Sequence, residues 1–98
     1  MTRRLVVRPE ASAHIAEAFS WYQAQRDDLG WELKAELDAA FRLVQQAPEA
    51  GPVAYRGLRR MLLNRFPYAV YYTHTPELIE IRALIHNRRH PRHWRSRA

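Results

Sequence analysis

The sequence predicts an α+β domain in which a short N-terminal strand precedes an antiparallel helical hairpin, and this hairpin packs on a small, mainly antiparallel sheet. The expected element order is β-α-α-β-β-β. Apolar residues recur at spacings of three and four between residues 11 and 44, which is the period of amphipathic helices. Beyond residue 52 the period becomes that of strands, and their short connections favour antiparallel pairing. Because there is no internal linker or repeat, residues 1–98 are expected to form one domain.

The N-terminal half predicts one strand and two helices. Apolar and β-branched residues in Arg3–Pro9 favour a short strand, and its final proline suits the first turn of a helix. That helix is expected to run to about Arg26. Asp27 or Asp28 is then expected to cap a second, antiparallel helix that ends before residue 48. The apolar stripes consist of Ala11, Ile15, Ala18, Phe19 and Tyr22 in the first helix and of Leu29, Leu33, Leu37, Ala40, Phe41 and Val44 in the second.

The C-terminal half predicts three strands, at Arg59–Asn64, Tyr68–His74 and Leu78–His86. The last strand alternates, so that one of its faces is expected to pack against the helices. That face would carry Ile79, Ile81, Ala83 and Ile85, and the opposite face would carry Glu80, Arg82, Leu84 and His86.

Charge is unevenly distributed along the chain. Residues 1–55 carry six basic and eight acidic groups, a net charge of −2, whereas residues 56–98 carry ten arginines and two glutamates, a net charge of +8. This asymmetry, which includes a basic tail at about 87–98, indicates a polyanionic partner, either nucleic acid or an acidic protein segment. Fifteen of the sixteen basic residues are arginine, whose planar fork grips phosphate or carboxylate; high-GC coding also raises arginine content.

Several classes of protein are disfavoured by composition. The chain has no cysteine, which excludes disulfides and thiolate metal clusters. No apolar run approaches the ~20 residues that span a bilayer, and the short "LVVRPE" after "MTRR" is no signal peptide. We expect a small cytoplasmic domain.

Two motifs carry a resemblance to a known family. "LRRMLLNRFPYAVYY" (58–72), followed by "IEIRALIHNRRHPRHW" (79–94), resembles the C-terminal half of the RelE/ParE toxin superfamily, and most closely its ParE branch. In that branch an RRFPY-x-(V/I)-Y-Y hairpin leads to a strand ending in H-x-R-R-x-P-x-x-W, and here Asn64 replaces an arginine often found in the hairpin. The resemblance covers nearly the whole chain, and its specific part is 58–94.

The resemblance implies the toxin of a type II toxin–antitoxin pair, neutralised by a cognate, acidic antitoxin that wraps it. ParE-branch members are associated with poisoning DNA gyrase, whereas RelE-like members cleave mRNA on the ribosome, so the fold does not choose between them. We expect a non-enzymatic, cofactor-free inhibitor that binds its target, by resemblance DNA gyrase. The alternative is a RelE-like, metal-independent endoribonuclease. A toxin-derived module that retains only antitoxin recognition is a third interpretation.

The ribonuclease alternative requires a general base, a general acid and cations around the transition state. His86 titrates near neutrality and ends the last predicted strand, although a packing role for it stays open. Arg65, Arg88 and Arg89 would supply the cations.

A metal site at His86, His90 and His93 is not expected. Five arginines crowd this segment without an acidic residue, and their field opposes a bound dication. Pro91 also restricts His90 to extended backbone.

Two binding surfaces are predicted. The target-binding set, which could hold phosphates or acidic side chains, consists of Arg59, Arg60, Arg65, Arg82, Arg88, Arg89, His90 and Trp94. Trp94 would anchor the tail on its own domain or on a partner. Trp21 and Trp31 lie near the turn between the helices and, where exposed, would contact the antitoxin; partial burial there is the alternative.

Overall fold

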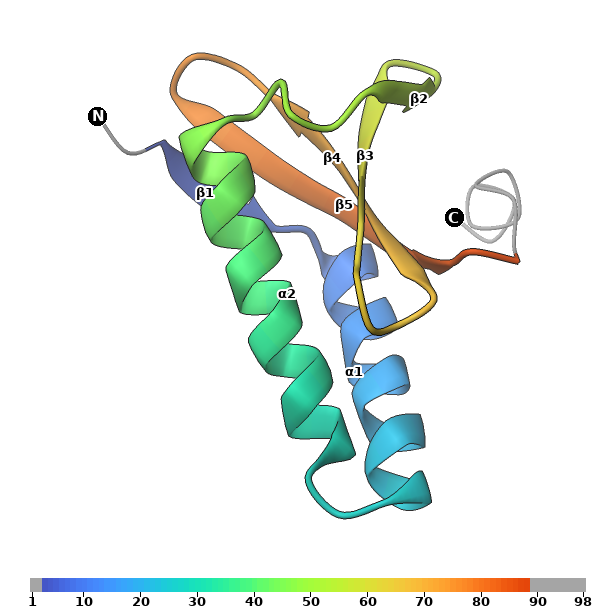
Figure 1. The fold of residues 1–98 in the computed structure, drawn as a ribbon. Coiled ribbons are helices and arrows are strands. Elements are labelled where there is room, and N and C mark those ends of the chain that lie inside the picture. Colours follow the sequence, from blue (N-terminus) through green and yellow to red (C-terminus); the bar gives the residue numbers. More distant parts are fainter. Residues whose placement is uncertain (1–2, 89–98) are drawn as a thin grey trace.

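The computed structural model describes residues 3–88, which form two helices and one mixed sheet. The elements in chain order are β1 (Arg4–Val7), α1 (Pro9–Gln25), α2 (Leu29–Gln46), β2 (Val53–Tyr55), β3 (Leu58–Leu62), β4 (Tyr68–His74) and β5 (Leu78–His86). The strand order is β1-β5-β4-β3-β2; β1 pairs with β5 in parallel, and the other neighbours pair antiparallel. The helices lie side by side, and their connecting turn projects beyond the sheet (Figure 1). The predicted α+β class and helical hairpin are confirmed.

The strand β2 was not predicted. It has only three residues and forms a hairpin with β3 through Arg56 and Gly57, whose φ angles are 48° and 80°. Two successive positive φ values suit the tight turns that join twisted antiparallel strands. Arginine rarely adopts such a φ, so the pair Arg56–Gly57 gives a weaker turn signal than Asn-Gly would.

A bulge in β5 overturns the predicted alternation of that strand. Tyr72 pairs with Ile81 and Tyr71 pairs with Ala83, so Arg82 is an extra residue that faces no partner in β4. An extra residue of this kind shifts every later side chain to the other face of the sheet.

The bulge divides the apolar residues of β5 between two clusters. Ile79, Ile81 and Leu84 join the main core with residues from both helices. Ala83 and Ile85 belong to a second cluster that includes no helical residue. The prediction that Ala83 and Ile85 face the helices, with Leu84 on the opposite face, is therefore wrong.

A glycine lets the helical hairpin close tightly. Gly30 is buried, and a Cβ atom there would lie 2.8 Å from the backbone oxygen of Phe19. Its N–H donates to the Oε1 of Gln23 over 2.8 Å. Asp28 is the N-cap of α2, as expected, but it has a φ of 72° and its side chain makes no capping hydrogen bond. The hydrogen bond between Gly30 and Gln23 therefore joins the two helices near the start of α2, where a side-chain cap was expected.

A buried tyrosine fixes the connection between α2 and β2. The hydroxyl of Tyr72 donates to the backbone oxygen of Pro48 over 2.7 Å and accepts from the N–H of Gly51 over 3.1 Å. Tyr72 is completely buried in β4, at the centre of the sheet. Its hydroxyl thus satisfies two backbone groups that would otherwise be buried without partners.

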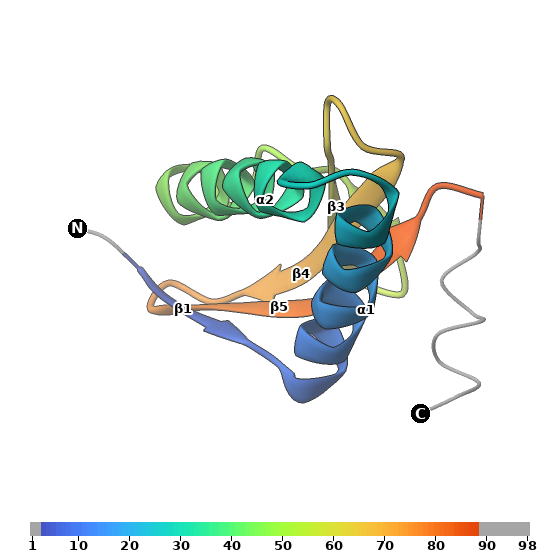
Figure 2. The same ribbon diagram turned by 90° about the horizontal axis from the view of Figure 1, so that it is seen from below.

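The two helices are closest at their connecting turn and diverge toward the sheet, with β1 at the open end (Figure 2). Their buried residues are Ala11 and Ala18 in α1 and Gly30, Leu33, Leu37 and Val44 in α2. Within residues 3–88 neither helix has the length and hydropathy needed to cross a membrane.

Candidate functional site

His86 ends β5 and is held by two contacts. Its Nδ1 accepts a hydrogen bond from the backbone N–H of Arg88 over 3.1 Å. Its ring meets the ring of Tyr68 edge to face, with centroids 5.2 Å apart. The backbone N–H of Asn87 donates to the oxygen of Pro67 and closes the strand end. His86 therefore packs at the strand end, and because its Nδ1 accepts a hydrogen bond, the neutral ring carries its proton on Nε2.

Rings continue from His86 to the surface of α1. Tyr68 contacts Tyr22 at a centroid distance of 6.1 Å, and Tyr22 also contacts Phe66 at 5.0 Å and Trp21 at 4.9 Å. We call these five residues the aromatic row: Trp21, Tyr22, Phe66, Tyr68 and His86. Burial raises the pKa of the Tyr22 hydroxyl, and a hydrogen bond with Tyr68 partly offsets this shift. The row connects the end of β5 to Trp21, whose side chain is 57% exposed.

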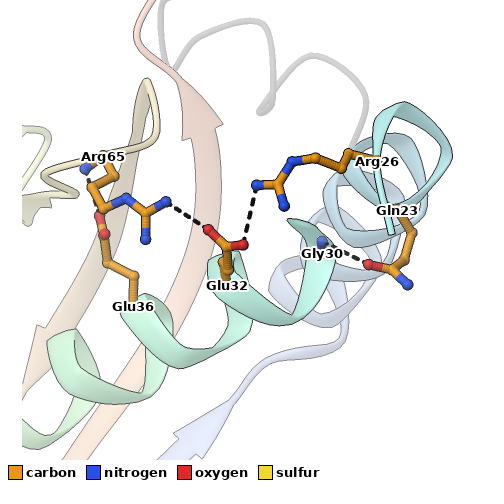
Figure 3. Close-up of polar contacts among 6 residues, drawn as sticks. All are labelled: Gln23, Arg26, Gly30, Glu32, Glu36 and Arg65. Carbon is orange, nitrogen blue, oxygen red and sulfur yellow. Dashed lines mark hydrogen bonds and ion pairs between the residues drawn. The ribbon is translucent and has the colours of Figure 1, made fainter. Parts of the chain in front are cut away.

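Arg65, predicted to bind a target or stabilise a transition state, is held by a carboxylate. Its guanidinium lies 2.6 Å from Oε1 of Glu32, and the other oxygen of Glu32 lies 3.1 Å from Arg26 (Figure 3). These hydrogen bonds, chiefly the one from Arg65, lower the pKa of Glu32. The guanidinium of Arg65 also lies over the Phe66 ring, 5.7 Å from its centroid.

Glu36 fixes the turn that carries Arg65. Its Oε1 accepts a backbone hydrogen bond from Arg65 over 2.9 Å (Figure 3). It accepts a second one from the backbone N–H of Asn64 over 2.6 Å. Because Glu32 and Glu36 are one helical turn apart on α2, they hold the β3–β4 turn through both its backbone and its side chain. Within residues 3–88 no hydrogen bond or ion pair joins Arg65 to His86.

The remaining arginines of the predicted target-binding set are dispersed. Arg59 donates to the backbone oxygens of Gly51 and Glu49 and so supports the α2–β2 connection. Arg60 is exposed on β3 and Arg82 is the bulge residue of β5. Arg88 is exposed just beyond β5, and the predictions for Arg89, His90 and Trp94 lie outside the described residues.

A groove of about 470 Å³ lies between the helices, beside β1. Its rim includes Trp31, which is 58% exposed and meets Phe19 edge to face at 4.9 Å. The groove is lined by Val7, Ser12, Ile15, Ala16, Phe19, Ser20, Trp31, Lys34, Leu37, Asp38 and Phe41. Trp21 does not line it. The two tryptophans, predicted to share one surface, therefore lie on different ones.

Neither the groove nor the Glu32–Glu36 clamp, the two carboxylates that hold the β3–β4 turn, was predicted from the sequence. Phe19 and Phe41 were assigned to the apolar stripes of the helices; both are partly buried and line the groove, and Phe41 also packs against the main core. Two acidic residues at a spacing of four on α2 were the available signal for the clamp. Among residues 3–88 no three histidine, aspartate or glutamate side chains converge as metal ligands.

The family model of the ParE toxin of the type II toxin–antitoxin system parDE matches residues 5–91. This chain belongs to the ParE toxin family. Toxin ParE2 of Mycobacterium tuberculosis (strain CDC 1551 / Oshkosh) is 35% identical over 92 residues, which cover 93% of this chain and 88% of that toxin. Toxin ParE2 of strain ATCC 25618 / H37Rv matches with the same identity and coverage.

A solved structure of the chromosomal ParDE toxin–antitoxin system from P. aeruginosa has the same fold. It matches with a TM-score of 0.75 and covers 87% of this chain and 96% of the solved chain. The sequence identity is 17%, so this match concerns the fold alone. The ParE assignment made from the hairpin and strand-end motifs is confirmed by the family model and the relatives.

Proposed function

We propose that this ParE-family toxin arrests growth by binding DNA gyrase, and that a cognate antitoxin neutralises it. Gyrase is the target that the resemblance to the ParE branch implies. Binding is favoured over catalysis because two side chains that RNA cleavage would need are already held by other groups. Glu32 holds the guanidinium of Arg65, and the Nδ1 of His86 accepts the N–H of Arg88.

The gyrase proposal is tested by a supercoiling assay with the purified toxin. We expect inhibition that rises with toxin concentration and disappears when the antitoxin is added first. Unchanged supercoiling at high toxin excess would exclude gyrase as the target.

We further propose that the antitoxin lays an amphipathic helix into the groove beside Trp31. The groove presents Ile15, Phe19 and Phe41 to apolar side chains at helical spacing, as helix-in-groove recognition requires. Lys34 and Asp38, 3.5 Å apart on the rim, add a charged pair that can select the orientation of the helix.

The groove proposal is tested with Trp31→Ala, because exposed tryptophans commonly dominate protein interfaces. We expect a loss of about 2 kcal/mol in antitoxin binding, which is about 30-fold in Kd by calorimetry. Leu43→Ala is the matched control, since Leu43 is exposed on α2 but does not line the groove. Equal affinities of the two variants would refute the groove assignment.

The second candidate function is ribosome-dependent mRNA cleavage, favoured by the placement of His86 against Tyr68 at the end of β5. In this case His86 would release the N–H of Arg88 so that its ring could act as base or acid, and Arg88 would stabilise the phosphorane-like transition state. Induced expression would then yield transcripts cut in the ribosomal A site, and His86→Ala would abolish the cuts. Intact transcripts after induction of the wild-type chain would exclude this candidate.

A further inference from the structure

We infer that Trp21 is the centre of a second contact surface, which binds the protein target of the toxin and is separate from the antitoxin groove. This inference rests on the proposed function. It reassigns Trp21, which the sequence placed with Trp31 on one antitoxin surface.

The position of Trp21 on α1 separates its side chain from the groove. The groove is lined on this helix by Ser12, Ile15, Ala16, Phe19 and Ser20, which form one continuous stripe. Trp21 follows Ser12 by nine positions, or roughly two and a half turns of an α-helix. The Trp21 side chain therefore leaves the helix on the side opposite to the groove. A helix seated in the groove would leave Trp21 uncovered.

The Trp21 ring is supported by other aromatic rings. Although Trp21 is 57% exposed, its ring packs edge to face on Tyr22, and Tyr22 packs in the same way on Phe66. Phe66 is only 5% exposed and belongs to the main core. The indole is thus held by rings that are anchored in the core. A side chain already held in place loses less rotational freedom on binding, which is the property of an interface anchor.

The charged groups near the aromatic row indicate the chemical class of the partner. Binding to single-stranded nucleic acid combines stacking rings with a row of cations that follow the phosphates. Near the aromatic row, however, the carboxylate of Glu32 already pairs with both Arg26 and Arg65. Arg88 remains exposed at the end of the row, beside His86. The exposed Trp21 ring, with the exposed Arg88 at the other end of the aromatic row, fits a protein surface that offers an apolar pocket flanked by carboxylates.

The experiment compares Trp21→Ala with Trp31→Ala, two substitutions at tryptophans of almost equal exposure, 57% and 58%. Each variant is induced in cells without antitoxin to measure growth arrest, and each purified protein is titrated with antitoxin. For Trp21→Ala we expect at least a tenfold weaker arrest, as for loss of an interface anchor, with antitoxin affinity within about twofold of wild type. Trp31→Ala should show the opposite pattern.

Thermal unfolding of each variant tests for a general loss of structure. Trp21→Phe keeps a ring against Tyr22 and should therefore partly restore growth arrest. Wild-type arrest by Trp21→Ala, or loss of its antitoxin affinity, would overturn the inference. A parallel loss of affinity for a single-stranded oligonucleotide would overturn the assignment to a protein partner. If the wild-type chain itself fails to arrest growth, the toxin proposal fails instead, and that result is distinguishable from the others.

Discussion

The hydroxyl of Tyr72 bonds two backbone groups of the α2–β2 connection. Tyr72→Phe should lower the free energy of unfolding by about 1–3 kcal/mol, because the buried N–H of Gly51 and oxygen of Pro48 lose their partner. Urea denaturation measures this change. Tyr71→Phe is the matched control, since no hydrogen bond to its hydroxyl occurs within residues 3–88, and it should cost much less. Equal losses for the two variants would contradict the role of Tyr72.

The pairing of Glu32 with Arg65 and Arg26 makes a pH-dependent contribution to stability. Because the pKa of Glu32 is lower in the folded chain than in the unfolded chain, its stabilising effect is present at neutral pH. It is lost as the pH falls through the folded-state pKa. We expect the melting temperature of Glu32→Gln to lie below that of the wild type at neutral pH and to converge with it in acid. Salt should reduce the difference, since the pair is at the surface.

The matched control for this measurement is Glu77→Gln, because Glu77 is exposed and its carboxylate makes no ion pair within residues 3–88. Its melting temperature should follow that of the wild type throughout. If the difference in melting temperature between the wild type and Glu32→Gln does not change with pH, the pH-dependent contribution is wrongly assigned to Glu32.

The sequence indicated single candidate side chains, but it did not indicate the residues that these side chains contact. Trp31 and His86 were selected because exposed tryptophans and strand-end histidines are chemically conspicuous. The sequence assigned Arg65 to a target, but Glu32, which lies 33 positions away, holds its guanidinium. Contacts over such a separation depend on how α2 crosses the β3–β4 turn, and local patterns do not contain that information.

At the scale of elements, the closest contact in the hairpin depends on Gly30. Alanine normally stabilises a helix relative to glycine, but the added Cβ would press against the backbone oxygen of Phe19 at 2.8 Å. Gly30→Ala should therefore lower the free energy of unfolding by about 1–3 kcal/mol, as overpacked sites do.

The control for Gly30→Ala is Ala39→Gly, at an exposed position of α2 where glycine should cost about 1 kcal/mol. Thermal unfolding then gives opposite preferences at the two sites of one helix. A stabilised Gly30→Ala variant would show that the helices are not as close as described.

The elements themselves were predicted well where their period was long and uninterrupted. The bounds of β4 and β5 agree with the prediction, and both helices end within a residue or two of the expected positions. The bulge at Arg82 was missed because it is a property of the pairing between β4 and β5, and β5 alone still alternates. The short β2 was missed because three residues carry too little periodicity.

At the scale of the whole molecule, the sheet joins the two ends of the described chain. β5 lies between β1 and β4, so the last of the described strands in chain order links β1 to the rest of the sheet. A chain ending at Glu77 should therefore lack a cooperative thermal transition, whereas the full chain should unfold in one step. Circular dichroism during heating distinguishes the two. A sharp transition in the shortened chain would show that β5 is dispensable.

The position of β5 between β1 and β4 also has a consequence for the cell that makes the protein. β1 pairs in the sheet only after Leu78–Ile81 of β5 have been translated. A stalled ribosome or a broken transcript can release a fragment without β5, which we expect not to fold. We therefore expect growth arrest to require a message that is read through β5.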